Sequence, residues 1–219
     1  MTVRPTLRRE RHLFRQGATV IACIDEVGRG ALAGPVTVGV VLLSDDVRRA
    51  PRGIRDSKLL SPQSREALLP QIREWVTAHA VGHASAQEID ESGIMACLRA
   101  AALRALSDLP AAPDAILLDG RHDFLAVTRQ TSLWDPPETG LPSVTTVVRG
   151  DLRCTGIACA SIIAKCARDA LMVQLATDYP NFEWARNKGY GTREHVEAIA
   201  RFGPSREHRR SWRLPVRHD

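Results

Sequence analysis

The chain has 219 residues, a formal net charge of +5 at pH 7 and 44% hydrophobic residues, a composition typical of a soluble globular protein with one sizeable core. Its most apolar stretch, residues 157–176, is interrupted by charges and the basic N-terminus lacks an apolar centre, which excludes a membrane span and a signal peptide. The five cysteines form no CxxC pair, which argues against zinc or a disulfide framework. We therefore expect a cytoplasmic protein whose positive charge favours a polyanionic partner.

Five short apolar runs predict the strands of a sheet. The first run is rich in β-branched and small apolar residues, as in a buried strand, and the second alternates along its length. The last two runs each end at an aspartate. The predicted strands lie at residues 20–24, 36–42, 77–86, 114–120 and 143–151.

Capping signals place helices between and after these strands. A serine followed by proline at residues 61–62 opens a helix that is expected to end near Trp75. The S-x-x-E pattern at residues 85–88 is a capping box for the next helix, which is expected to break near Gly93. Further helices are expected over residues 154–177 and 192–203.

The order of these elements indicates an α/β domain with a mixed central sheet. Strands one to three are expected to form an antiparallel meander, the later strands to enter in parallel through helical crossovers, and helices to cover both faces. We expect one domain over residues 18–213, with a helical C-terminal segment from about residue 180. The expected appendages are a flexible basic arm at residues 1–17 and a tail at 214–219, and the acidic, proline-rich loop 133–140 is expected on the surface.

Acidic side chains come at the ends of the predicted strands. Asp25 and Glu26 end the first strand, Asp119 ends the fourth, and Asp151 follows the fifth. Parallel neighbouring strands present their carboxyl ends at one edge of a sheet, so the four acids are expected to converge and to repel one another unless cations lie among them. Two Mg²⁺ or Mn²⁺ ions would suit such oxygen ligands and could clamp the attacking water and the leaving oxygen of a phosphodiester. The alternative is that these acids are solvated turns.

Three glycines follow the first strand in "GRGALAG", residues 28–34. Their spacing differs from that of a dinucleotide-binding fingerprint, and a strand is expected after them where the fingerprint requires a helix. The missing side chains at Gly28 and Gly30 instead let the backbone approach a ligand directly.

Seven motifs, in order from about residue 20 to about 213, resemble those of bacterial ribonuclease HII, the type 2 ribonuclease H family. A D-E-x-G-R-G sequence after a strand is specific by itself, and the three lysines of the chain all fall inside the set. The motifs are IDEVGRGALAGPVTVGVVLL (24–43), DSKLLS (56–61), LLDG (117–120), RGD (149–151), ASIIAKCARDALM (160–172), NKGYGTREH (187–195) and FGPSREHRRSW (202–212).

The resemblance implies a ribonuclease H-like fold and an endonuclease that cuts RNA/DNA hybrids, or DNA duplexes with embedded ribonucleotides, on the 5′ side of a ribonucleotide. The products would carry 3′-hydroxyl and 5′-phosphate ends. The metal-binding carboxylates of the family fall on the four acids reached above from strand ends, and two divalent ions, Mn²⁺ or Mg²⁺, are implied. The resemblance leaves contact with a sliding clamp open, and we expect a monomer.

The resemblance also implies substrate-binding residues. The backbone of Gly28, Arg29 and Gly30 would sense the 2′-hydroxyl, the group that distinguishes RNA from DNA. Tyr190 would hydrogen-bond that hydroxyl and pack against the next sugar. Lys58 would contact a substrate phosphate, and Lys188 is a weaker candidate for the same role. Arginines in the range 206–217 are expected to add salt-dependent affinity for the duplex, or else to form a solvated basic tail.

Some positions depart from the pattern of the family, or have a second interpretation. The family commonly has lysine where this chain has Arg149, and histidine where it has Asn187, which puts the positioning of Asp151 and Tyr190 in doubt. Lys165 supports its helix, where it could pair with an aspartate four residues later, or contacts substrate. Two other functions fit the acids and the charge: a DNA-cutting two-metal nuclease of the same fold, or a non-catalytic nucleic-acid-binding module.

Overall fold

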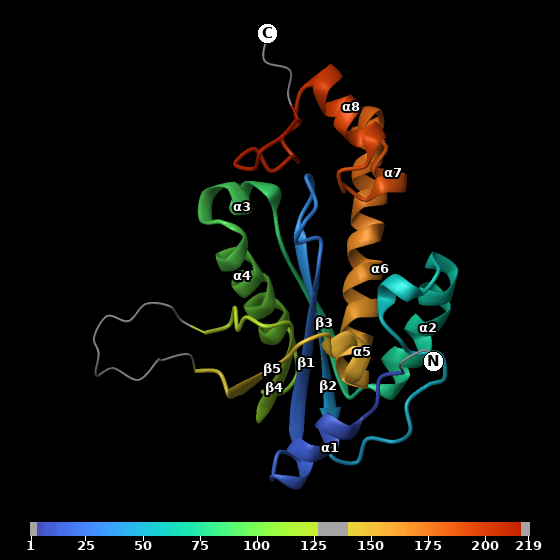
Figure 1. The fold of residues 1–219 in the computed structure, drawn as a ribbon. Helices are drawn as coiled ribbons and strands as arrows, with labels where there is room; N and C mark the ends of the chain where they lie inside the picture. Colours follow the sequence, from blue (N-terminus) through green and yellow to red (C-terminus); the bar gives the residue numbers. More distant parts are fainter. Residues whose placement is uncertain (1–3, 127–139, 216–219) are drawn as a thin grey trace, which may run out of the picture.

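The computed structural model describes residues 4–126 and 140–215 (Figure 1). Its five-stranded sheet has the order β3-β2-β1-β4-β5. β1, β2 and β3 pair antiparallel in an up-and-down meander, whereas β4 and β5 run parallel to β1. The predicted mixed sheet is therefore confirmed. The strands are β1 (Val20–Val27), β2 (Val36–Ser44), β3 (Ala78–Ala84), β4 (Ala115–Asp119) and β5 (Ser143–Val147).

Helices cover both faces of the sheet, as expected (Figure 1). Because successive side chains of a strand point to opposite faces, Ile21 and Cys23 of β1 pack in one core with α6 (Thr155–Asp178) and α2 (Pro62–Trp75). The alternate residues Ala22 and Ile24 pack in a second core with α4 (Ile94–Ser107). The remaining helices are α1 (Arg8–Arg15), η1 (Ser57–Leu59), α3 (Ala86–Ser92), α5 (Gly150–Arg153), η2 (Pro180–Phe182), α7 (Trp184–Asn187) and α8 (Arg193–Phe202).

The capping signals locate the helix ends correctly. The Ser61 hydroxyl accepts a hydrogen bond from the Ser64 amide at 3.1 Å at the start of α2. Ser85 and Glu88 form the reciprocal capping box at the start of α3. The break falls at Gly93, whose φ of 79° lies in the region that favours glycine. These short-range signals depend only on neighbouring residues, which explains why the sequence predicts them well.

The expected flexible arm at residues 1–17 is wrong for Arg8–Arg15, which form α1. The Glu10 carboxylate is fully buried and accepts a hydrogen bond from the Gly156 amide at 2.8 Å, while Leu13 and Phe14 pack against the core. Burial raises the pKa of Glu10 to about 6. The apolar face of α1 and this buried carboxylate thus attach the N-terminal segment to the start of α6. Most of the loop predicted at residues 133–140 lies outside the described residues.

Within residues 4–126 and 140–215, no helix combines the length and the apolar character that crossing a bilayer requires.

A buried histidine pair holds the C-terminal segment together. His195 and His208 are fully buried and face each other with 3.1 Å between their Nε2 atoms. Trp184 Nε1 donates to His195 Nε2 at 3.0 Å, and the Ser205 amide donates to His208 Nδ1 at 2.9 Å. These two fixed donors determine the tautomers: His208 Nε2–H donates to His195, and His195 Nδ1–H donates to the Tyr190 carbonyl at 2.9 Å. Both rings are therefore neutral in the folded protein.

Because of this buried histidine pair, we expect the free energy of unfolding to decrease in mild acid. Burial, together with His195, lowers the pKa of His208 from 6.5 to about 4. Between these pH values the unfolded chain binds more protons, so this contribution to the free energy of unfolding is complete above pH 6.5 and disappears as the pH falls towards 4. The loss should reach about 3 kcal/mol, because a change of one in pKa corresponds to roughly 1.4 kcal/mol. Urea unfolding at several pH values measures it.

The matched variant for this measurement is His208→Gln, in which the side chain at position 208 no longer titrates. Buried acids with raised pKa, such as Asp25, act in the opposite direction in both proteins, so the difference between the two pH curves isolates His208. Parallel curves for the two proteins between pH 6.5 and 4 would contradict the prediction.

Candidate active site

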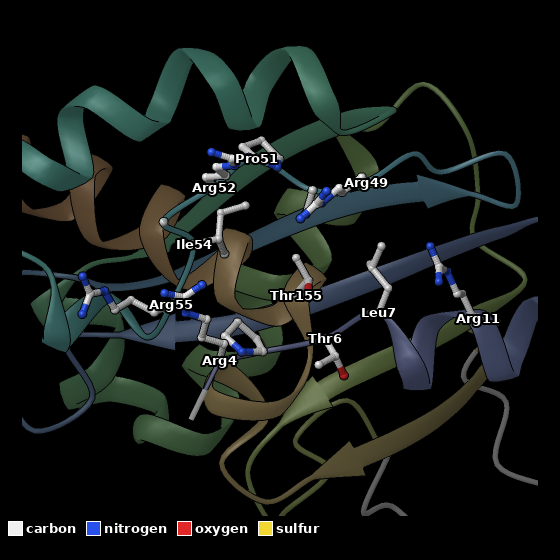
Figure 2. Close-up of a pocket in the computed structure, with 13 residues that line it drawn as sticks. Arg4, Thr6, Leu7, Arg11, Arg49, Pro51, Arg52, Ile54, Arg55 and Thr155 are labelled. Carbon is white, nitrogen blue, oxygen red and sulfur yellow. The ribbon is translucent and has the colours of Figure 1, made fainter. Parts of the chain in front are cut away.

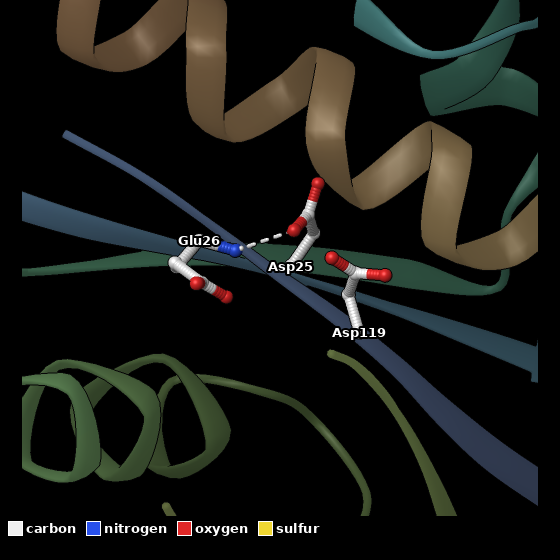
Figure 3. Close-up of side chains that lie close together, drawn as sticks. All are labelled: Asp25, Glu26 and Asp119. Carbon is white, nitrogen blue, oxygen red and sulfur yellow. Dashed lines mark hydrogen bonds between the residues drawn. The ribbon is translucent and has the colours of Figure 1, made fainter. Parts of the chain in front are cut away.

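Three of the four predicted acids lie together at the carboxyl end of β4 and near that of β1. β1 continues through Asp25 and Glu26, and its parallel neighbour β4 ends at Asp119. Because Ile24 lies opposite Leu118 in the register, Asp25 and Asp119 come side by side. One carboxylate oxygen from each of Asp25, Glu26 and Asp119 lies within 4.8 Å of the others (Figure 3). This arrangement is a compact set of hard oxygen ligands.

Asp151 lies beside this group, on the short helix α5. The Gly150 amide donates to Asp119 Oδ1 at 2.5 Å, which fixes the start of α5 against the end of β4. Asp151 Oδ2 faces Lys58 Nζ at 3.5 Å. Burial, followed by Asp56 and Asp119, raises the pKa of Asp151, although Lys58 opposes them. Asp151 in turn is one of the charges that add to the effect of burial in raising the pKa of Asp25. The fourth acid is therefore close enough to interact electrostatically with Asp25 and Asp119.

The acidic cluster stores unfavourable electrostatic energy that a cation would relieve. Burial, followed by Asp119 and Glu26, raises the pKa of Asp25 well above its ordinary value. Burial and Asp119 also raise the pKa of Glu26, although Arg29 opposes them. Glu26 Oε2 is buried without a hydrogen-bond partner among the described residues. A buried, unpaired carboxylate oxygen among other carboxylates fits a hard divalent cation.

The two glycines of the G-R-G triplet have different surroundings. Gly28 has a φ of 83°, and a Cβ there would lie 2.1 Å from Arg168 Nε, so the missing side chain makes room for a neighbouring arginine. Gly30 is exposed, and a Cβ there would meet no atom within 4 Å among the described residues. The open space that a ligand could enter therefore lies at Gly30.

Buried arginines shape the loop over residues 28–35, which contains the G-R-G triplet and which we call the G-R-G loop. Arg168 of α6 donates to the carbonyls of Ala33 and Pro35 at 3.0 and 2.8 Å, and to the Lys188 carbonyl at 2.8 Å. Sequence reasoning missed this role, although an arginine inside an otherwise buried helix was the available signal. Arg168 thus ties the G-R-G loop to the turn that carries Lys188 and Tyr190.

Arg209 binds the other side of the same loop. Its guanidinium donates to the carbonyls of Gly28 at 2.6 Å, Arg29 at 2.9 Å and Gly34 at 3.1 Å. The expectation that arginines in the range 206–217 contact the duplex from a basic tail is wrong for Arg209, because this residue is fully buried. Burial and the charge of Arg168 lower the pKa of Arg209 to about 9. The C-terminal segment is therefore part of the framework of the site.

Tyr190 is half-buried at the junction of these elements. The Arg168 guanidinium lies 5.4 Å from the centre of its ring, within the range of a cation–π interaction. The Gly189 carbonyl accepts hydrogen bonds from the amides of Leu32 and Ala33 at 2.8 and 3.2 Å. Backbone bonds and arginines together hold the turn with Tyr190 against the loop with Gly30.

The lysines of the motifs differ in what they contact. The side chain of Lys58 is 75% exposed beside Asp151, so its ammonium remains accessible to a ligand. Lys188 has a left-handed backbone, with a φ of 52°, and its ammonium donates to the Ala185 carbonyl. Lys165 pairs with Asp169 at 2.5 Å, which confirms the predicted partner on the helix.

The two departures from the motif have structural roles. Asn187 accepts from the Gly189 amide at 2.8 Å and donates to the Phe182 carbonyl at 2.7 Å, so it stabilises the turn that carries Tyr190. Arg149 has a left-handed backbone with a φ of 55° immediately before α5, a strained conformation that orients the segment carrying Asp151.

The sheet is mixed, with an antiparallel meander and two parallel strands, and acids gather near the carboxyl ends of β1 and β4. These features define the class of ribonuclease H-like nucleases, which depend on divalent metals. The family model described as Ribonuclease HII matches residues 22–214. The chain belongs to the ribonuclease HII family and is an endonuclease of the ribonuclease H type.

Similar proteins extend over nearly the whole chain. The ribonuclease HII of Streptomyces avermitilis is 47% identical over 95% of this chain and 83% of its own length. That of Bacillus licheniformis is 42% identical over 95% of this chain and 74% of its own. Among solved structures, ribonuclease H2 of Pyrococcus horikoshii has a TM-score of 0.67 at 25% identity, covering 90% of this chain and 95% of its own. Ribonuclease HII of Archaeoglobus fulgidus, solved in complex with PCNA, has a TM-score of 0.68 at 27% identity, covering 91% and 98%.

Proposed function

We propose that the protein hydrolyses the phosphodiester on the 5′ side of a ribonucleotide, in RNA/DNA hybrids and in DNA with embedded ribonucleotides, leaving 3′-hydroxyl and 5′-phosphate ends. Removal of misincorporated ribonucleotides from DNA would be its role. The observation that carries the proposal is the partly buried acidic cluster, which includes a Glu26 oxygen without a hydrogen-bond partner among the described residues. The cluster lies at the end of the strand that leads into the open backbone at Gly30.

The acids would hold two divalent ions, Mg²⁺ or Mn²⁺. Asp25, Glu26 and Asp119 offer the closest set of oxygens, and Asp151 would complete it from α5. Two bound ions supply Lewis-acid activation of water and stabilise the leaving oxygen of a phosphodiester. The hydrogen bonds from the Gly150 amide to Asp119 and from the Glu26 amide to Asp25 orient the carboxylates in advance.

The loop and the turn beside the acids would select the sugar. The backbone at Gly28, Arg29 and Gly30 would sense the 2′-hydroxyl, with Gly30 offering the free space, and Tyr190 would bond the same hydroxyl and pack against the next sugar. Lys58 would hold a phosphate beside the acids, and Lys188 would turn away from Ala185 to reach another.

Cleavage of a labelled DNA duplex with one ribonucleotide, beside an all-DNA duplex, tests this function with Mg²⁺, Mn²⁺ or EDTA. We expect a single cut 5′ to the ribonucleotide, lost in EDTA and absent from the all-DNA duplex. Equal cutting of both duplexes would instead support a DNA-processing nuclease, and metal-independent binding without turnover would support a non-catalytic module.

A methyl group added at Gly30 tests the sugar-reading loop. Gly30→Ala should leave the thermal midpoint nearly unchanged, because a Cβ there meets no described atom within 4 Å. It should lower kcat/KM for a single embedded ribonucleotide by roughly tenfold or more, because the added methyl group would displace the hydrogen bond between the loop backbone and the 2′-hydroxyl. Losing such a hydrogen bond costs about a few kcal/mol of binding free energy. Gly28→Ala is the contrasting variant and should reduce the thermal midpoint, because its Cβ would overlap Arg168. Full activity of Gly30→Ala would exclude a close approach at that position.

The protein is proposed to act as a monomer. The Archaeoglobus relative is solved in complex with PCNA, and contact of this chain with a sliding clamp remains a prediction for its tails. Size-exclusion chromatography with and without a bacterial clamp measures both properties.

A further inference from the structure

The N-terminal segment and the loop before η1 enclose a hollow of about 750 Å³ that is lined by arginines (Figure 2). Thr155 at the start of α6 and the apolar side chains of Leu7 and Ile54 also line it. None of the described residues in its lining is acidic. The arginines around it are Arg4, Arg11, Arg49, Arg52 and Arg55.

A second hollow of about 680 Å³ adjoins the first, and Arg4 and Thr6 line both. Within residues 4–126 and 140–215, its lining also includes no acid, and it adds Arg8, Arg9, His12, Arg15 and Arg153. We call the nine arginines of the two hollows the arginine surface. It joins α1, the loop over residues 49–55 and the end of α5.

The arginine surface is not neutralised by ion pairs within the part of the chain that the structure describes. None of its guanidinium groups takes part there in an ion pair. Eight of the nine arginines are exposed, and Arg55 is half-buried. Glu10, the one acid of α1, is turned into the core. So many like charges on one face repel one another, and a polyanion would relieve this repulsion. Guanidinium groups suit phosphate because their planar donors match its oxygens.

Two short stretches of the chain connect the arginine surface to the active site. Arg55 lies three residues before Lys58, and Arg153 lies two residues after Asp151. Lys58 and Asp151 themselves face each other at 3.5 Å. A phosphate chain leaving the acids past Lys58 would therefore meet Arg55 first and then the remaining arginines. Two hollows in succession suit a linear chain of phosphates better than a single small anion.

We propose that the arginine surface binds the sugar–phosphate backbone of the substrate duplex on one side of the scissile bond. This inference rests on the proposed function, because it takes the duplex in the active site as the ligand. The contacts reach phosphates and no bases, so they raise affinity without sequence preference.

The test compares two double variants with the same decrease in charge. Arg49→Gln/Arg52→Gln removes two arginines of the first hollow, and Arg48→Gln/Arg73→Gln removes two exposed arginines outside the arginine surface. Substrates are DNA duplexes with one ribonucleotide and an arm that is shortened on the 5′ side or on the 3′ side. Circular dichroism melting checks that both variants fold.

We expect Arg49→Gln/Arg52→Gln to raise KM roughly tenfold on duplexes with two long arms, with kcat unchanged. The same variant should have no effect on duplexes in which the arm that reaches the arginine surface is shortened. The slope of log affinity against log salt should fall by roughly two, because each of the two arginines neutralises about one phosphate. The control should change KM on all substrates alike and only slightly. Equal effects of the two variants, or an effect independent of both arms, would overturn the proposal.

Binding measured without cleavage separates this proposal from the proposed function. Fluorescence anisotropy of the same duplexes in EDTA reports affinity even if no substrate is cut, and a selective decrease for the first variant would then still support the arginine surface. If inorganic phosphate raises the thermal midpoint of the unchanged protein but not of the first variant, while duplex affinity is equal in both, the hollow holds a small anion and the proposal is wrong.

Discussion

Replacing Asp119 by asparagine is expected to reduce cleavage of a ribonucleotide-containing duplex by at least about 10²–10³-fold, the cost of losing one group that stabilises developing charge. Asp119 lies in the closest set of acidic oxygens, and asparagine removes its charge while its Oδ1 can still accept from the Gly150 amide. The thermal midpoint should stay the same or rise, because the change relieves repulsion on Asp25 and Glu26. Single-turnover cleavage in Mg²⁺ and Mn²⁺ together with thermal melting provides both measurements.

The control for this substitution is Asp108→Asn, which removes an exposed carboxylate after α4 and should leave the rate unchanged. A similar decrease in both variants would mean that net charge affects the rate. If Asp119→Asn kept most of its cleavage activity, Asp119 would have only a structural role and the proposed metal site would be wrong.

Replacing Arg209 by methionine should destabilise the fold by about 3 kcal/mol or more, since it leaves buried carbonyl groups without donors. Arg209 donates to three carbonyls of the G-R-G loop, and methionine matches its length but not its hydrogen bonds. Discrimination between ribose and deoxyribose at the cleavage site should weaken as well, because the loop proposed to read the sugar loses its support. Urea unfolding measures the first effect, and the ratio of kcat/KM for the two sugars measures the second.

Arg210→Met is the matched control, one residue further along the chain. Arg210 is exposed, and its backbone amide, which donates to Asp90 at 2.9 Å, is unaffected by the substitution. It should change stability by less than about 0.5 kcal/mol, as is usual for surface positions. A small effect of Arg209→Met, comparable with that of Arg210→Met, would show that the loop keeps its conformation without the buried guanidinium.

Most of the sheet and the helix ends could be predicted from the sequence because their signals are local. Pro62 after a serine, the capping box before α3 and the β-branched run of β1 each involve residues within a few positions of one another. The convergence of Asp25 and Asp119 followed from one further rule, that parallel neighbours end at the same edge.

What the sequence did not reveal depends on interactions between distant segments. Arg168 and Arg209 reach carbonyls of the G-R-G loop that are separated from them by more than a hundred positions, and no periodicity encodes such a pairing. Helix α1 was missed for a different reason: its arginines outnumber its apolar residues, although Leu13 and Phe14 face the core and Glu10 binds Gly156. Propensity is a weak guide where a few tertiary interactions decide the conformation.

The position of Arg209 has a consequence for how the protein is made. All four acids lie within the first 151 residues, but the guanidinium that fastens the G-R-G loop belongs to a segment synthesised much later. A nascent chain, or one clipped before Arg209, would therefore possess the carboxylates while the loop beside them remained loosely held. The proposed selectivity for the sugar would thus be acquired last, when the C-terminal segment docks.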